Sequence, residues 1–160
     1  MPLVIELLDG QRHNRNGFAC GDAALDNYLH QLAGQHQRAG IATTHVLVDS
    51  ASPAQVLGFC SLAAAQVHLS ALTAADRKRL PAYPVPAMRM GRLAVASHAQ
   101  GQGHGQLLLG HAVNLALSVR QTMGVRVLLV DAKDAQVAAF YERYGFRRTA
   151  SRALTLYLQV

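Results

Sequence analysis

The sequence predicts a single domain of the α/β class, in which a splayed, mixed central sheet is flanked by helices. Its 160 residues suit one domain, and 51% of them are hydrophobic with a mean hydropathy of +0.12, which indicates a sizeable core. The spacing of the apolar residues also switches along the chain between the periodicity of helices and that of strands. They give a strand, a helix and antiparallel strands, and then strand–helix–strand–helix–strand.

The first half of the chain is expected to hold three strands and two helices. Asp22 and Thr73 precede helical patterns and are typical N-cap residues, and the turn-rich segment 49–55 separates two strands that can pair antiparallel. The expected elements are a strand over 3–8, a helix over 23–36, strands over 43–48 and 56–67, and a connector over 69–86 with a short helix over 74–80.

The second half is expected to alternate strands with helices. Gly124 is expected to end the first helix as a C′ glycine, Asp134 to cap the second helix, and Gly145 to end it. The expected elements are a strand over 87–95, a helix over 104–123, a strand over 125–131, a helix over 135–144, and strands over 146–150 and 153–159.

The composition argues against several classes of protein. No apolar run approaches the roughly 20 residues that span a bilayer, and the N-terminal segment lacks the basic residues of a signal peptide. We therefore expect a cytoplasmic protein without membrane association. Cys20 and Cys60 are expected to be structural thiols, and the eight histidines lack the spacing of a metal site.

The segment AQGQGHGQLLLG at 99–110 follows a predicted strand and opens a predicted helix. It lacks the last glycine of a dinucleotide-binding motif and the Gly-Lys-Ser/Thr of a P-loop. Glycines at a helix N-terminus still leave unpaired N–H groups exposed, which suits a pyrophosphate. The alternative is that the glycines only permit a tight turn between strand and helix.

Three segments resemble the GNAT superfamily of N-acetyltransferases. They are Gln100-x-x-Gly103-x-Gly105, the preceding strand Arg92–Val95, and DAQVAAFYERYGF at 134–146, where Asp134 and Val137 depart from the usual Asn and Ala. The resemblance implies a GNAT fold that binds acetyl-CoA, although the motif does not demand Gly101. The cofactor-binding residues it implies are Leu93, Ala94, Val95, Gln100, Gly101, Gln102, Gly103, His104, Gly105, Asp134 and Phe140.

The segment FACGDAALDNYL at 18–29 is similar to the opening of the tRNA-acetylating toxins of type II toxin–antitoxin modules. This resemblance implies acetylation of the α-amine of aminoacyl-tRNA, a small DNA-binding antitoxin as partner, and a homodimer. Phe18, Leu25, Tyr28 and Leu29 also form an apolar helix face that packs in the core. The alternative functions are an N-acetyltransferase for a protein N-terminus or small amine, and a binding module without activity.

Direct transfer of an acetyl group needs a polarised thioester and a proton for the departing thiolate. Backbone N–H groups near Leu93–Val95 are candidates for polarising the carbonyl. The resemblance places the family's catalytic tyrosine at Tyr141, and a phenol with a pKa of about 10 remains a proton donor at neutral pH. The alternative is that Tyr141 only fills the core. Acidic residues are scarce after Asp76, which favours an α-amine acceptor over the more basic lysine.

Basic residues concentrate in the second half of the chain. Residues 1–76 carry three arginines and six carboxylates, whereas residues 77–160 carry twelve basic and three acidic side chains. This excess favours an anionic partner, and contacts to phosphates would give affinity rather than sequence reading. The candidates for tRNA contacts are Arg77, Lys78, Arg79, Arg89, Arg92 and Arg148, with Arg143, Arg147 and Arg152 in the same basic group.

Overall fold

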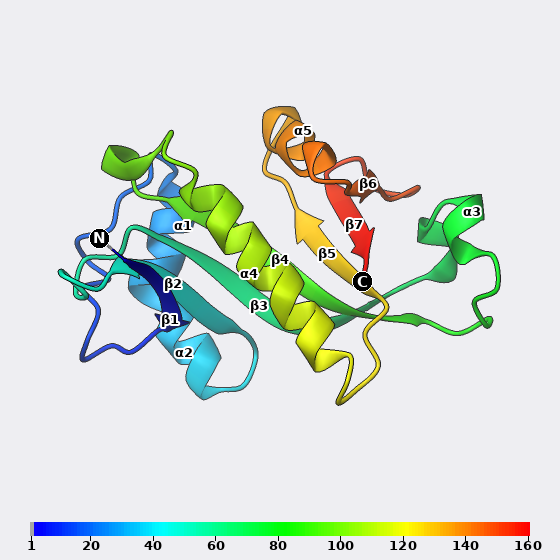
Figure 1. Ribbon diagram of the computed structural model, residues 1–160, viewed down its shortest axis with the longest axis horizontal. Coiled ribbons are helices and arrows are strands. Elements are labelled where there is room, and N and C mark those ends of the chain that lie inside the picture. Colours follow the sequence, from blue (N-terminus) through cyan, green and yellow to red (C-terminus); the bar gives the residue numbers. More distant parts are fainter. Residues whose placement is uncertain (1) are drawn as a thin grey trace. The chain divides into compact units, whose positions relative to one another are not determined.

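The computed structural model describes residues 2–160 and confirms the α/β class, with a seven-stranded mixed sheet (Figure 1). The strand order is β1-β2-β3-β4-β5-β7-β6. β4 and β5 are parallel, whereas β1–β2, β2–β3, β5–β7 and β6–β7 pair antiparallel. The strands are β1 Leu3–Leu7, β2 Thr43–Asp49, β3 Gly58–Val67, β4 Val85–Val95, β5 Val127–Asp131, β6 Arg147–Arg148 and β7 Thr155–Gln159.

The three predicted N-caps are confirmed. The side chain of Asp22 accepts from two N–H groups of the first turn, Thr73 Oγ1 accepts from the Asp76 N–H, and Asp134 Oδ1 accepts from the Val137 N–H. The helices are α1 Ala23–Asn27, a π-helical turn Tyr28–Leu32, α2 Ala33–Arg38, α3 Ala74–Arg77, α4 His104–Val119 and α5 Ala135–Arg143, with 3₁₀ turns at Leu69–Ala71 and Ser97–Ala99.

The chain divides into two compact units. The first unit is Met1–Ala63 with Arg92–Ala112, and the second is Ala64–Gly91 with Val113–Val160. β3, β4 and α4 each contribute residues to both units. That the chain is a single domain stays a prediction.

In the first unit, β2 has helices on both of its faces. Val46 and Val48 are buried in one core cluster with Tyr28 and Leu29 of the helical segment 23–38. His45, which points to the other face because strand side chains alternate, contacts His111 of α4. The N-terminal half of α4 and the helical segment 23–38 therefore lie on opposite faces of β2.

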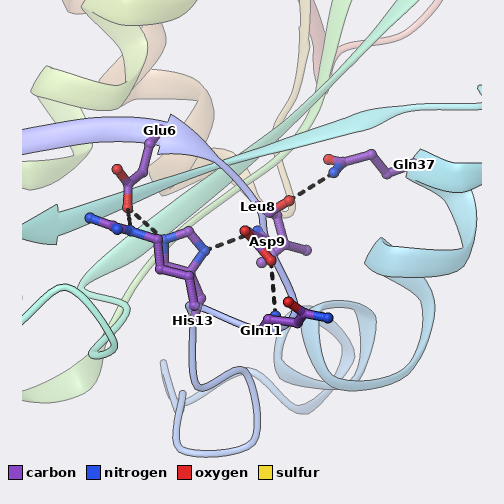
Figure 2. A network of polar contacts seen from close by, with 7 residues as sticks. Glu6, Leu8, Asp9, Gln11, His13 and Gln37 are labelled. Atoms are coloured by element: carbon purple, nitrogen blue, oxygen red, sulfur yellow. Dashed lines mark hydrogen bonds and ion pairs between the residues drawn. The ribbon is translucent and has the colours of Figure 1, made fainter.

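A polar network fixes the end of β1 to α2 (Figure 2). The buried His13 accepts at Nδ1 from the Asp9 N–H at 3.0 Å, so its proton is on Nε2, which lies 2.7 Å from Glu6 Oε1. Hydrogen bonds from His13 and Arg12 lower the pKa of Glu6. The side-chain amide of Gln37 donates to the Leu8 carbonyl at 2.8 Å. This network is structural, because its polar groups satisfy one another.

In the second unit, α5 packs against β7, and a separate apolar cluster joins β4, β5 and β7. The buried Tyr157 of β7 accepts from the Thr73 N–H at 3.0 Å and donates to Asp76 Oδ2 at 2.6 Å. Burial, followed by the bond to Asp76, raises the pKa of Tyr157. The connector that contains α3 is therefore held by β7.

Three predicted elements are shorter in the structure. The helix expected over 104–123 ends at Val119. Beyond it the N–H groups of Gln121 and Thr122 bond to carbonyls three residues earlier, and Gly124 is not among the glycines with a positive φ, so its predicted C′ role is wrong. α3 stops at Arg77, and the strand expected over 146–150 is reduced to β6 because a hydrogen-bonded turn follows it.

Candidate active site

The glycine loop between β4 and α4 is an exposed turn that leads into a helix N-terminus. Gly101 and Gly103 have φ angles of 79° and 82°, which residues with a side chain rarely adopt. A Cβ at either position would meet nothing within 4 Å, so the backbone conformation itself requires glycine. Gly101, which the motif does not demand, is therefore as constrained as Gly103.

Several unpartnered polar groups gather where this loop meets α4. The helix begins at His104, followed by Gly105, and the first N–H groups of a helix have no partner within it. His104 is buried, and its Nδ1 has no hydrogen-bond partner within residues 2–160. Unpaired N–H groups, an orphaned buried nitrogen and open glycines fit the pyrophosphate of a coenzyme. Gln102 lies exposed in the same loop.

Gln100 anchors the loop rather than presenting its amide to the open space. Its side-chain NH₂ donates to the carbonyl oxygens of Cys20 at 3.1 Å and Val95 at 3.0 Å. The Cys20 N–H in turn donates to Asp26 Oδ1 at 2.8 Å. The segment 18–22 is thereby joined to the end of β4 and to α1. In the structure Gln100 is a positioning residue, and this is a contact that the sequence did not predict.

β3 approaches the end of β4 closely at Gly58. A Cβ at this position would lie 2.9 Å from the Ala94 carbonyl oxygen and 3.0 Å from Cδ1 of Leu108, so only glycine fits. Ala94 is buried, while Leu93 and Val95 are half-buried. At Ala94, the middle one of the three strand residues expected to contact the coenzyme, β4 therefore lies directly against β3.

Arg92 stacks on the ring of the buried Tyr28. Its Cζ lies 3.6 Å from the ring centre, which is a cation–π contact, and the Tyr28 hydroxyl lies 3.1 Å from His36 Nδ1. Among the described residues 2–160, no carboxylate forms an ion pair with Arg92. Its guanidinium is oriented by the ring while its N–H groups remain available to a ligand.

Tyr141 lies on α5 in the second unit and is buried, with 1% of its surface exposed. Its ring contacts those of Phe140 and Phe146, with centroids 5.4 and 5.7 Å away. Phe140 is half-buried, and Asp134 uses its carboxylate to cap α5. Glu142 is exposed and bonds Arg148 at 3.1 Å, so it is engaged outside the tyrosine cluster.

Two of the arginines expected to contact tRNA are paired with carboxylates. Arg89 makes a bidentate ion pair with Asp131 at 2.6 and 2.7 Å, which raises the pKa of Arg89, and Arg148 pairs with Glu142. Arg147 of the same basic group lies 3.6 Å from Asp76. These pairs neutralise part of the positive charge that the composition suggested.

The basic run Arg77, Lys78 and Arg79 is exposed at the end of α3. Arg79 has a φ of 75°, the one positive value at a non-glycine position within residues 2–160. Such backbone is strained for a bulky side chain and persists where the surroundings fix it. The bonds of Thr73 and Asp76 to Tyr157 fix the N-terminal part of the same segment.

A histidine pair lies on the α4 side of β2. His111 Nε2 is 3.0 Å from His45 Nδ1, and burial, with a smaller effect of His111, lowers the pKa of His45 to about 4. Burial also lowers the pKa of His111. Within residues 2–160, no three His, Cys, Asp or Glu side chains are grouped to hold a metal ion.

The sequence also led to expectations about the cysteines and about membrane-spanning helices. Cys20 and Cys60 are free thiols in the structure, and burial raises their pKa values to about 11 and about 12. No helix in the described part of the chain is both long and apolar enough to cross a membrane.

A family model described as an acetyltransferase (GNAT) domain matches residues 40–148, which include the loop, the end of β4 and Tyr141. The chain belongs to the GNAT family. It is an acetyltransferase, and the acetyl donor of this family is acetyl-CoA. The resemblance to the GNAT superfamily that the sequence predicted is thus confirmed, while the coenzyme contacts of the glycine loop stay a prediction.

Several relatives of this GNAT chain are acetyltransferase toxins. A protein of Mycobacterium tuberculosis named "tRNA-acetylating toxin" is 31% identical over 142 residues, covering 88% of this chain and 82% of that protein. The structure of AtaT complexed with acetyl-methionyl-tRNAfMet has a TM-score of 0.92 at 28% identity and covers 99% of this chain and 95% of that chain.

A second AtaT structure carries a tyrosine-to-phenylalanine change and is bound to the C-terminus of the antitoxin AtaR and to acetyl-CoA. It has a TM-score of 0.83 at 27% identity, and the match covers 98% of this chain and 92% of that chain. The similarity to these toxins that the sequence predicted is therefore confirmed.

Proposed function

We propose that the protein transfers an acetyl group from acetyl-CoA to the α-amine of the amino acid on an aminoacyl-tRNA, and so blocks translation. The observation that carries this proposal is the match over nearly the whole chain to AtaT solved with acetyl-methionyl-tRNAfMet. The relative named "tRNA-acetylating toxin" supports the same acceptor.

The donor site in this proposal is the glycine loop with the end of β4. The N–H groups at the start of α4 hold the pyrophosphate, and the positive φ angles of Gly101 and Gly103 allow the backbone to approach it. The backbone of Leu93–Val95 would bind the arm of the coenzyme. Gln100 acts by holding this loop on the end of β4.

Acetyl-CoA, when bound, supplies the thioester whose acetyl group is transferred. In the proposed step the amine nitrogen bonds to the carbonyl carbon and the carbon–sulfur bond breaks. N–H groups near Leu93–Val95 stabilise the negative charge that develops on the carbonyl oxygen. Tyr141 gives its hydroxyl proton to the departing thiolate, and the proton lost by the amine passes through water to the Tyr141 phenolate, which restores the phenol.

The carboxylates support an α-amine as the acceptor. Each of the nine Asp and Glu side chains accepts a hydrogen bond from another group of this chain. Each carboxylate of the chain is therefore already engaged by another group, and within residues 2–160 none stands uncommitted as a candidate general base. An α-amine, with a pKa of about 8 or below, needs less help from a base than a lysine with a pKa of about 10.4.

We further propose that the chain works as a toxin in the cytoplasm, that it forms a homodimer, and that a small DNA-binding antitoxin neutralises it. The AtaT structure bound to the C-terminus of AtaR supports the antitoxin as a partner. Growth inhibition on expression, relieved by a small protein encoded beside this chain, tests the toxin proposal. Measurement of the molar mass in solution tests the dimer.

The experiment that tests the acceptor supplies radiolabelled acetyl-CoA with four substrates in parallel. These are charged tRNA, the same tRNA uncharged, the free amino acid, and a peptide with a free N-terminus and a lysine. We expect label on the charged tRNA alone. Label on the peptide or the free amino acid at a comparable rate would instead support a general amine acetyltransferase.

A further inference from the structure

Two arginine side chains of the first unit converge on one glycine of α2. A Cβ at Gly34 would lie 2.8 Å from Nη1 of Arg15 and 3.2 Å from Nη1 of Arg38. The two nitrogens therefore lie within about 6 Å of each other, and like charges at this distance repel. Arg15 and Arg38 are far apart in the sequence, so the fold itself brings them together.

Neither of these guanidinium groups has a carboxylate partner among residues 2–160. Arg15 is half-buried, and a Cβ at Gly10 would lie 3.5 Å from its Nη2, so its guanidinium lies between two glycines. By contrast Arg12, close to Arg15 in the sequence, donates to Glu6 at 2.7 Å. Within residues 2–160, the converging pair thus presents its donors without a carboxylate acceptor.

We infer that the Arg15–Arg38 pair is a phosphate-binding site for the RNA backbone of the acceptor, a conclusion that rests on the proposed function. Guanidinium groups match phosphate oxygens with two parallel hydrogen bonds each, and a bound phosphate removes the repulsion between the two cations. Arg38 lies in the last turn of α2, where the helix dipole favours a cation. The dipole does not account for Arg15, which lies outside any helix.

The site is an RNA site rather than a site for an acidic protein segment, because the acceptor carries a phosphate at every nucleotide. Its two arginines are not among the basic residues that the sequence singled out, since Arg15 and Arg38 come from the acidic first half of the chain. The structure therefore assigns a phosphate contact to a region where net charge predicts none.

The test measures the affinity of the full chain for bulk charged tRNA at several KCl concentrations. The variants are Arg15→Gln, Arg38→Gln and, as the matched control that also removes one cation, Arg12→Gln. We expect each of the first two to weaken binding several-fold and to reduce the slope of log affinity against log salt by about 0.7 to 0.9. Arg12→Gln, whose cation is already paired, should leave both quantities at the wild-type values.

A second variant, Gly34→Ala, tests the geometry without changing the charge. Its Cβ must displace the Arg15 guanidinium, while alanine favours the helix. We expect weaker binding of tRNA at an unchanged or higher melting temperature. Wild-type binding by Gly34→Ala would contradict the site.

The remaining outcomes separate this inference from the proposed function. Unchanged binding by Arg15→Gln and Arg38→Gln, or equal losses in all three arginine variants, would overturn the phosphate site even if the wild-type enzyme acetylates charged tRNA. An acidic peptide is assayed in parallel. If Arg15→Gln and Arg38→Gln keep their affinity for tRNA but lose affinity for this peptide, the phosphate site is overturned in favour of a protein partner. If wild-type binding depends on the pair but no acetyl group is transferred, the site stands and the proposed function fails.

Discussion

The guanidinium of Arg92 lies over the ring of Tyr28, with 3.6 Å between its Cζ and the ring centre. Arg92 stands on β4 immediately before the strand residues assigned to the coenzyme, and Tyr28 stands in the segment similar to the toxins. The contact joins the two parts of the sequence from which the donor and the acceptor were inferred. A cation oriented at this point is suited to bind a phosphate of the proposed tRNA acceptor.

Removing the Tyr28 ring should therefore impair Arg92. We expect Tyr28→Leu to lower kcat/KM for charged tRNA to the level of Arg92→Gln. The double variant should show no further loss, because both changes remove the same cation–π contact. Tyr28→Phe keeps the ring and loses only the bond to His36, and should retain most of the activity. Additive losses in the double variant, measured well below the melting temperature, would show that the two residues act separately.

Replacement of Tyr141 by phenylalanine should remove the proposed proton donor while the ring cluster with Phe140 and Phe146 remains. We expect kcat to fall by about 10²-fold, the lower end for loss of a general acid. The KM for acetyl-CoA and the melting temperature should change little. The measurement is the release of the coenzyme thiol with saturating charged tRNA. Full turnover by Tyr141→Phe would refute the acid role.

Glycine-to-alanine changes should separate the loop from the helix that follows it. Gly103→Ala forces a side chain into a positive φ, at a cost of about 1 kcal/mol or more, so we expect a higher KM for acetyl-CoA. Gly110→Ala in α4 is the matched control, since a Cβ there meets nothing within 4 Å. It should keep the wild-type KM and raise the free energy of unfolding by about 0.5–1 kcal/mol. Equal effects on KM would contradict the role of the loop.

The histidine pair predicts a pH dependence of stability. The folded pKa of His45 is about 4, below its ordinary value of 6.5, so between these pH values the unfolded chain binds more protons. His45 therefore contributes stability above pH 6.5 that is lost as the pH falls towards 4. Melting temperatures measured across this range should fall more steeply for the wild type than for His45→Gln. Parallel curves for the two proteins would disprove the contribution of His45.

The local elements of this fold could be predicted from the sequence because their signals are local. Asp22, Thr73 and Asp134 each cap the helix that follows them, and the positive φ of Gly145 fits its predicted place after α5. The C-terminal limit of α4 was missed because its apolar period continues beyond Val119, where the backbone turns away from the helix.

The contacts of the candidate site could not be predicted in the same way. The bonds of Gln100 to Cys20 and Val95, and the stacking of Arg92 on Tyr28, join residues far apart in the chain, and they depend on strand register and rotamer. The need for glycine at position 58 could not be predicted from the sequence either. This need comes from the Ala94 carbonyl, which only the paired strands reveal.

Acetylation of the α-amine of charged tRNA is tested most directly by the chemical position of the transferred acetyl group. Charged tRNA is acetylated with radiolabelled acetyl-CoA, recovered, and treated with mild alkali, which cleaves the ester between amino acid and ribose. We expect the label to leave the RNA as an N-acetyl amino acid. Label that stays on the RNA, or that is found only on protein, would contradict acetylation of the α-amine.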